Sequence, residues 1–299
     1  MSDQVAVVTA LGAAIVFGIS SVAEQSSTKR VAQRRALSPR ILLDLVRQPL
    51  WVASIGGTLT GFALQVVALK YGPLALVEPI LVCDLIFAVL INAALRHRWD
   101  PIMLAGVFAT ALGVAGFLAI SRPSGGNSTV GIAVVLPLAA GLAALLAGCM
   151  AVARRSEDLR PLALALACGV CYGASAFLVK LVTGGGLTHL FTTWPIYALA
   201  VIAPIGFVLN QDAFQQGKLL PPVLSIITAC DPIVSIALGF LWLNESLNGT
   251  PAGIAGQIIA LALMVGGIVI MAHHSPQVLK KLSEDEGAAA GPGASRKPV

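Results

Sequence analysis

The chain has 299 residues, of which 57% are hydrophobic and only 11% are charged. Its mean hydropathy is +0.88. Because soluble domains carry about 25% charged residues, this composition excludes an ordinary soluble protein and indicates a membrane protein. The net charge of +5 comes from basic residues in short segments between apolar runs, so it does not indicate nucleic-acid binding. All five cysteines lie inside apolar runs, which argues against structural disulfides.

Nine apolar runs are long enough to cross a bilayer, because about 20 apolar residues span the hydrocarbon core as a helix. In chain order they cover residues 4–25, 50–70, 73–95, 101–121, 130–153, 161–183, 192–214, 219–243 and 251–273. Four begin at a proline, a residue that is tolerated in the first turn of a helix; these are Pro73, Pro101, Pro161 and Pro251. The sequence therefore predicts an all-α polytopic membrane protein with nine transmembrane helices.

The basic residues are unevenly distributed between the two sides of this arrangement. Sixteen lie in the first, third, fifth and seventh connections and in the C-terminal tail, whereas only Lys70, Arg122 and Lys180 lie on the other side. The positive-inside rule then places the N-terminus outside and the C-terminus in the cytoplasm of a cell membrane, inner or plasma. Residues 1–273 form a single transmembrane domain. Residues 274–299, rich in Gly, Ala and Ser with mixed charge, are expected to be a disordered cytoplasmic tail.

The two halves of the chain repeat each other helix by helix. The matching pairs, first half before second, include Gly18 and Gly173, Ser20 and Ser175, Gln65 and Asn210, and Asp84 and Asp231. Their order is kept, and their offset stays between 145 and 155 residues. Residues 4–121 are one repeat, residues 161–273 the other, and the helix at 130–153 is a linker. Because the linker reverses the direction of the second half, the sequence predicts an inverted-topology repeat, as found in secondary transporters.

Asp84 and Asp231 are the main candidates for a functional site. Both fall near the middle of a predicted span, where a carboxylate is costly and indicates a transport pathway by default. The pair is expected to bind a substrate or ion, either exchanging protons for a cation or serving as two carboxylate ligands of a metal cation. The alternative is that each is held by local hydrogen bonds or helix packing. Pro79 and Pro232 are expected to kink these helices and free backbone carbonyls.

Four further polar residues are weaker candidates for substrate or ion binding. On a regular helix Glu78 lies about 240° around from Asp84 and does not share its face, although the kink expected at Pro79 weakens this argument. Glu78 is either an acid of the outer vestibule or a carboxylate at the membrane interface. Gln65 and Asn210 either bind substrate or join helices by hydrogen bonds. Ser20 is a candidate for substrate binding, although its small size also fits close packing.

Other residues are expected to act in gating or helix packing. Ser175, a candidate substrate residue, lies beside Gly173 as Ser20 lies beside Gly18, and small residues of this kind favour close helix contact. Glu24 and Lys180 are expected near opposite membrane faces, where each either snorkels or serves as a gate charge.

The chain resembles the drug/metabolite transporter superfamily, also called EamA-like, and within it the NIPA branch of magnesium transporters. The resemblance rests on the segment 68–79, which joins two helices through the motif Leu-Val-x-Pro, and on Gly18 followed by the basic pair Lys29-Arg30. Glu245 resembles the acidic residue before the last helix of that superfamily, and a nine-helix layout resembles the branch, which has one helix fewer than usual. The similarity covers most of residues 4–273 and implies Mg²⁺ as a substrate.

The sequence thus favours a secondary transporter that moves a small cation, with Mg²⁺ as one candidate, or a small polar metabolite, by alternating access around Asp84 and Asp231. Two alternatives remain open: a proton-coupled metabolite or drug exporter, and a non-catalytic accessory subunit in lipid or cell-envelope handling. The sequence has no HExxH motif or catalytic triad pattern, so neither enzymatic activity nor a cofactor is expected. The expected partners are membrane lipids and the transported solute, without nucleic acid. A monomer and a homodimer are both compatible with the sequence.

Overall fold

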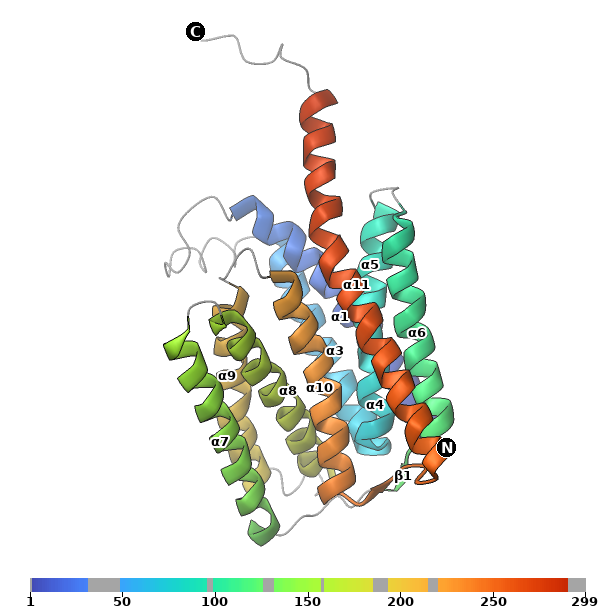
Figure 1. Ribbon diagram of the computed structural model, residues 1–299, viewed down its shortest axis with the longest axis vertical. Coiled ribbons are helices and arrows are strands. Elements are labelled where there is room, and N and C mark those ends of the chain that lie inside the picture. Colours follow the sequence, from blue (N-terminus) through green and yellow to red (C-terminus); the bar gives the residue numbers. More distant parts are fainter. Residues whose placement is uncertain are drawn as a thin grey trace.

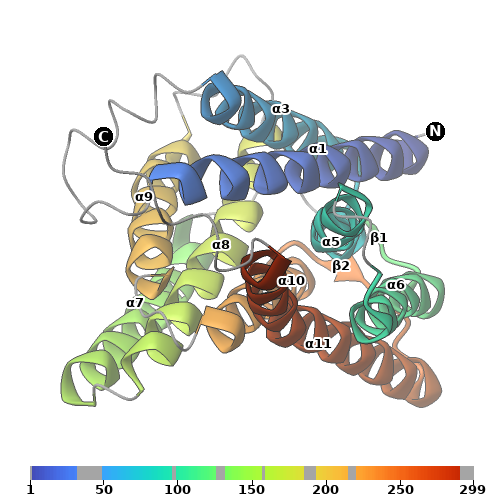
Figure 2. The same cartoon turned by 90° about the horizontal axis from the view of Figure 1, so that it is seen from above.

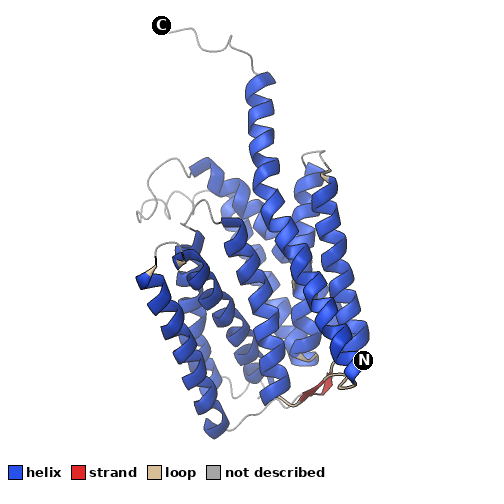
Figure 3. Ribbon diagram, viewed as in Figure 1, coloured by secondary structure: helices blue, strands red, loops and turns tan. Residues whose placement is uncertain are grey.

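The computed structural model describes residues 2–31, 49–95, 99–125, 132–156, 159–184, 193–214 and 220–289. These residues are almost wholly helical, with one short ribbon of two strands (Figure 3). The helices are α1 (Ser2–Val31), α3 (Pro49–Tyr71), α4 (Leu74–Leu81), α5 (Cys83–Leu95), α6 (Pro101–Ser121), α7 (Ile132–Arg155), α8 (Arg160–Gly184), α9 (Trp194–Phe214), α10 (Leu220–Trp242) and α11 (Pro251–Ala289). Strands β1 (Ser124–Gly125) and β2 (Glu245–Ser246) pair antiparallel.

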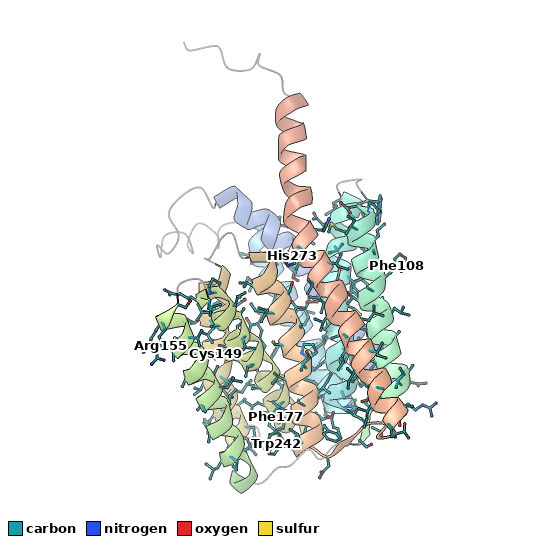
Figure 4. The ribbon with its side chains drawn as sticks, viewed as in Figure 1. Phe108, Cys149, Arg155, Phe177, Trp242 and His273 are labelled. Atoms are coloured by element: carbon teal, nitrogen blue, oxygen red, sulfur yellow. The ribbon has the colours of Figure 1, made fainter. Side chains whose placement is uncertain are left out.

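Apolar helices of membrane-spanning length dominate the described part of the chain. Seven segments are long and apolar enough to cross a bilayer: Asp3–Ala23, Val52–Tyr71, Leu74–Leu95, Pro101–Ser121, Arg160–Gly184, Ser225–Trp242 and Pro251–His274. A shorter apolar segment covers Trp194–Asn210 in α9. Phe108 on α6 points away from the bundle and is 71% exposed (Figure 4), although phenylalanine is usually buried in soluble proteins. These observations confirm the prediction of an all-α polytopic membrane protein.

The third predicted span, residues 73–95, is two helices rather than one. α4 ends at Leu81 and α5 begins at Cys83, with a turn at Val82 between them. Pro79, inside α4, lacks the N–H that would bond to the preceding turn, which weakens the helix at this point. The expected kink is therefore present here as a break. In the other half, α10 runs through Pro232 as a single helix.

Two helices extend further than the sequence predicts. α1 continues to Val31, past the predicted end of the first span at residue 25. α11 continues to Ala289, so the prediction of a disordered tail is wrong for residues 274–289. The residues that follow the last span include Leu, Lys and Glu, which are strong helix formers and can prolong a helix beyond the membrane. Residues 290–299 lie outside the described residues.

The helices form a bundle with a recurring packing pattern (Figures 1 and 2). α1 packs along α3 and α5, and α8 packs along α9 and α10. α6 runs along α11, and α7 lies at one edge of the bundle against α8. The start of α1 and the last turn of α11 lie at opposite ends, and α11 projects beyond the other helices (Figure 1). The β1–β2 ribbon lies at the end where α1 starts.

Candidate functional site

A cavity of about 450 Å³ lies between helices of the two halves. Its wall is formed by α1, α3, α4, α5, α8, α9 and α10. The polar residues of the wall are Thr58, Gln65, Glu78, Asp84, Tyr172, Ser175, Thr228 and Asp231. Three of them are carboxylic acids, and none of the described residues of the wall is Lys, Arg or His. Such a wall favours a positively charged occupant, because no basic side chain in it compensates the acids.

Both candidate aspartates line this cavity. Asp84 lies in the first turn of α5, directly after the break at Val82, and Asp231 lies within α10. Asp231 is close enough to Asp84 and to Glu78 for charges on these groups to repel each other. The Oδ1 atom of Asp231 is buried and has no hydrogen-bond partner in the described part of the chain. A buried acceptor without a partner costs about 1–3 kcal/mol, so binding a proton or a cation there is favourable.

Glu78 belongs to the same cavity, contrary to the expectation from a regular helix. Its side chain is only 3% exposed, and its Oε1 atom accepts a hydrogen bond from Gln65 Nε2 at 3.4 Å. The turn at Val82 lies between Glu78 and Asp84, and both side chains line the cavity. Glu78 thus lies in the same cavity wall as the two aspartates.

Two glycines allow the helices that carry the aspartates to be approached closely. A Cβ atom on Gly18 would lie 2.8 Å from the backbone oxygen of Asp84, and a Cβ atom on Gly173 would lie 2.7 Å from that of Asp231. Helix α1 therefore touches α5, and α8 touches α10, at the level of the aspartates. This is the packing role that the sequence predicts for both glycines.

The serine and amide candidates divide between the cavity and the helix contacts. Ser175 lines the cavity, and its Oγ atom donates to the carbonyl of Cys171 at 2.7 Å. Ser20 is buried beside Gly57 and is not part of the cavity wall, which fits the packing interpretation. Asn210 is also outside the wall. Its Oδ1 atom is buried without a hydrogen-bond partner among the described residues. The side chain of Glu24 lies outside the described residues.

Lys180 is buried rather than placed at a membrane surface, so the prediction that it snorkels is wrong. It is 7% exposed, and its Nζ atom donates to the carbonyls of Leu69 and Gly72, each at 2.6 Å. The last carbonyls of a helix lack partners within the helix, and the buried ammonium group satisfies that of Leu69 together with the carbonyl of Gly72, which directly follows α3. Lys180 thus fixes the end of α3 from the other half of the chain.

Glu245 binds the start of α4, on the other side of the turn whose first part Lys180 binds. Its oxygens accept hydrogen bonds from the backbone N–H groups of Leu74, at 2.7 Å, and Ala75, at 3.0 Å. It is 2% exposed and lies against Gly239, where a Cβ atom would come within 2.6 Å of Oε2. Burial raises the pKa of Glu245 above its ordinary value, although the two N–H groups and the charge of Lys180 oppose this shift. The sequence marks Glu245 only through a family resemblance.

The aromatic residues of the cavity were not predicted as site residues. Phe17, Phe62 and Tyr172 all line the cavity. Phe17 and Tyr172 directly precede Gly18 and Gly173, so they occupy matching positions of the repeat that the sequence predicts. That match was the signal that could have identified them.

The described part of the chain contains no dedicated metal-binding cluster. No group of three or more His, Cys, Asp or Glu side chains is arranged there to hold a metal ion. The two aspartates considered as metal ligands, Asp84 and Asp231, do face one cavity.

The fold and this site define an all-α, multi-pass membrane protein with an acidic cavity between its helices. The chain is similar to the uncharacterized protein Cgl0250/cg0304 of Corynebacterium glutamicum, with 28% identity over 283 residues. The match covers 92% of this chain and 96% of that protein. No protein-family model and no solved structure matches the chain.

Proposed function

We propose that this protein is a secondary transporter that moves a cation through the cavity by alternating access. The observation that carries this proposal is that Asp84, from the first half of the chain, and Asp231, from the second half, line one cavity. Ionisable residues inside membrane helices are costly and usually belong to a substrate or ion pathway. The cargo is a small cation, Mg²⁺ included, or a small polar metabolite with a positive charge.

The proposal includes nine spans built as an inverted repeat. The first four spans and the last four spans are the two repeats, and the fifth span, α7, is the linker. The packing pattern supports it, because α1 packs on α3 and α5 as α8 packs on α9 and α10. The contacts Gly18–Asp84 and Gly173–Asp231 have the same geometry in the two halves. The equivalent helices α6 and α11 pack against each other, as expected for elements next to a pseudo-two-fold axis.

The same arrangement supports two further parts of the proposal. A bundle of inverted repeats agrees with membership of the drug/metabolite transporter superfamily, near the NIPA branch. The start of α1 and the last turn of α11 lie at opposite ends of the bundle (Figure 1), as an odd number of spans requires. With the positive-inside rule, this supports an external N-terminus and a cytoplasmic C-terminus in the cell membrane.

A proton-coupled exporter is the second candidate function, and the state of Asp231 favours it. Its buried Oδ1 atom has no hydrogen-bond partner among the described residues, so a proton is a suitable occupant when the cavity is empty. Entry of a cation would then displace the proton, and the two movements would be coupled.

Flux in proteoliposomes tests the proposal. The full-length protein is reconstituted with an imposed pH gradient, and uptake of Mg²⁺ and of organic cations is measured together with proton movement. We expect saturable cation flux that is abolished by Asp84→Asn and by Asp231→Asn. Asp100→Asn is the matched control, because Asp100 caps α6 outside the cavity and asparagine is an equally good cap. Full flux in both cavity variants would overturn the proposal.

A further inference from the structure

We propose that the cavity binds an organic cation with an apolar body, held between two aromatic–carboxyl pairs, one from each half of the chain. The first pair is Phe17 and Asp84, and the second is Tyr172 and Asp231. This inference rests on the proposed transport function and narrows its cargo.

The two aromatic rings are built into the wall in the same way. Phe17 packs against Gly61 of α3, where a Cβ atom would lie 2.8 Å from the ring. Tyr172 packs against Gly206 of α9, where a Cβ atom would lie 3.2 Å from the ring. In each half, a glycine of the next helix thus leaves the space that the ring fills. Helix packing therefore holds both rings in fixed places in the cavity wall.

Rings and carboxylates recognise complementary parts of an organic cation. An aromatic face attracts a cation within about 6 Å of its centroid, by about 0.5–2 kcal/mol, and it also covers apolar groups around the charge. The carboxylates of Asp84, Asp231 and Glu78 supply the opposite charge, and among the described wall residues no basic side chain competes with the cation. The remaining wall is largely aliphatic, with Leu81, Val82, Val179 and Ile227 among its residues.

The size of the cavity also fits an organic molecule. Its volume of about 450 Å³ lies within the range of about 300–1,000 Å³ that is usual for sites of organic ligands. Mg²⁺ usually keeps several waters, and six waters at about 30 Å³ each occupy about 180 Å³. Hydrated Mg²⁺ would therefore leave more than half of the space against aromatic and aliphatic walls. An organic cation fills this space and buries those walls from water.

Binding to the purified full-length protein in detergent tests the inference by isothermal titration calorimetry. The probes are benzyltrimethylammonium, tetramethylammonium and Mg²⁺. In the wild type we expect benzyltrimethylammonium to bind at least about 10-fold more tightly than tetramethylammonium, because its ring buries apolar wall. Mg²⁺ should compete weakly with it. This comparison needs no variant, so it is decisive even if a substitution impairs folding.

Variants then assign the binding to the rings. Phe17→Leu and Tyr172→Leu should each weaken benzyltrimethylammonium binding about 2- to 30-fold, the range expected from the loss of one cation–π contact. Tyr172→Phe, which keeps the ring, and Phe108→Leu, on the exposed face of α6, should bind as the wild type does.

The possible failures are distinguishable. Mg²⁺ flux that requires Asp84 and Asp231, together with no binding of either organic probe, would overturn the organic-cation inference and leave the transporter proposal intact. Equal binding of benzyltrimethylammonium by wild type and both leucine variants would overturn the role of the rings. Full flux of any cation in both Asp→Asn variants would overturn the transporter proposal and this inference together.

Discussion

Glu245 accepts the backbone N–H of Leu74 at 2.7 Å, although 171 positions of sequence separate the two residues. The first N–H groups of a helix have no partner within the helix, and Pro73, at the N-cap position of α4, makes no side-chain hydrogen bond to them. The start of α4 is therefore capped by a residue of β2, in the other half of the chain. This cap fixes the position of α4, the helix from which Glu78 lines the cavity.

Removing this cap should destabilise the protein. Glu245→Ala deletes two hydrogen bonds to a buried charged acceptor, and such bonds contribute about 1.5–3 kcal/mol each. We expect the variant to lose at least about 1.5 kcal/mol of the free energy of unfolding, measured by denaturant titration in detergent. Glu245→Gln keeps one acceptor oxygen, so its free energy of unfolding should lie between those of the wild type and the alanine variant. Equal stability of the wild type and the alanine variant would contradict the assignment of the cap.

Lys180 and Glu245 should act as one unit. They attract each other electrostatically and bind successive parts of the same turn. Lys180→Met frees two buried carbonyls and leaves Glu245 without its opposite charge. In a double-mutant cycle with Glu245→Gln, we expect a coupling of about 0.5–3 kcal/mol in the free energy of unfolding. Additive effects would show that the two residues stabilise the turn independently.

Glu245 should also make stability depend on pH. Burial raises its folded-state pKa above the ordinary value of 4.5. The folded protein then holds this proton more tightly than the unfolded chain does. The stabilisation by protonation is therefore complete below pH 4.5 and is lost as the pH rises through the folded-state pKa. The thermal midpoint of the wild type minus that of Glu245→Gln should decrease as the pH is raised. A difference that stays constant with pH would exclude this group as the source.

The glycine contacts at the aspartates predict a sharp positional effect. Gly18→Ala and Gly173→Ala place a methyl group 2.8 and 2.7 Å from backbone oxygens that cannot move without shifting a helix. Each should cost about 1–3 kcal/mol of stability and reduce flux, because it displaces Asp84 or Asp231. Gly56→Ala is the control, since among the described residues no atom beyond its own helical turn lies within 4 Å of its Cβ position. A control as damaging as the two test variants would show that the effect is not steric.

The sequence predicts the helices well because each depends on a local property. Apolar runs of membrane-spanning length, with prolines at their starts, mark the spans, and α6 and α11 begin at the predicted Pro101 and Pro251. The two aspartates were found by the same local argument, since a carboxylate inside such a run is costly. Their presence in one cavity is what a pair of aspartates related by the predicted repeat would give.

The rest of the site depends on contacts that no local pattern contains. Glu78 and Asp84 line one cavity from the two sides of the helix break at Val82, whereas positions six apart on a regular helix lie about 240° apart. Lys180 was expected to snorkel because its partners are backbone carbonyls of a distant helix, which sequence composition does not reveal. Phe17 was overlooked as a cavity residue because an aromatic residue in a membrane helix usually faces lipid or core.

The cap of α4 also affects when this part of the protein can fold during synthesis. Ribosomes add about 5 to 20 residues per second, so Glu245 is synthesised about 9 to 34 s after Leu74. During this interval the N–H groups of Leu74 and Ala75 have no access to their final partner. The turn between α3 and α4 therefore reaches its native form only after synthesis has passed α10 and reached β2. A chain that ends between Pro232 and Glu245 would contain every described residue of the cavity wall but would lack the cap of α4.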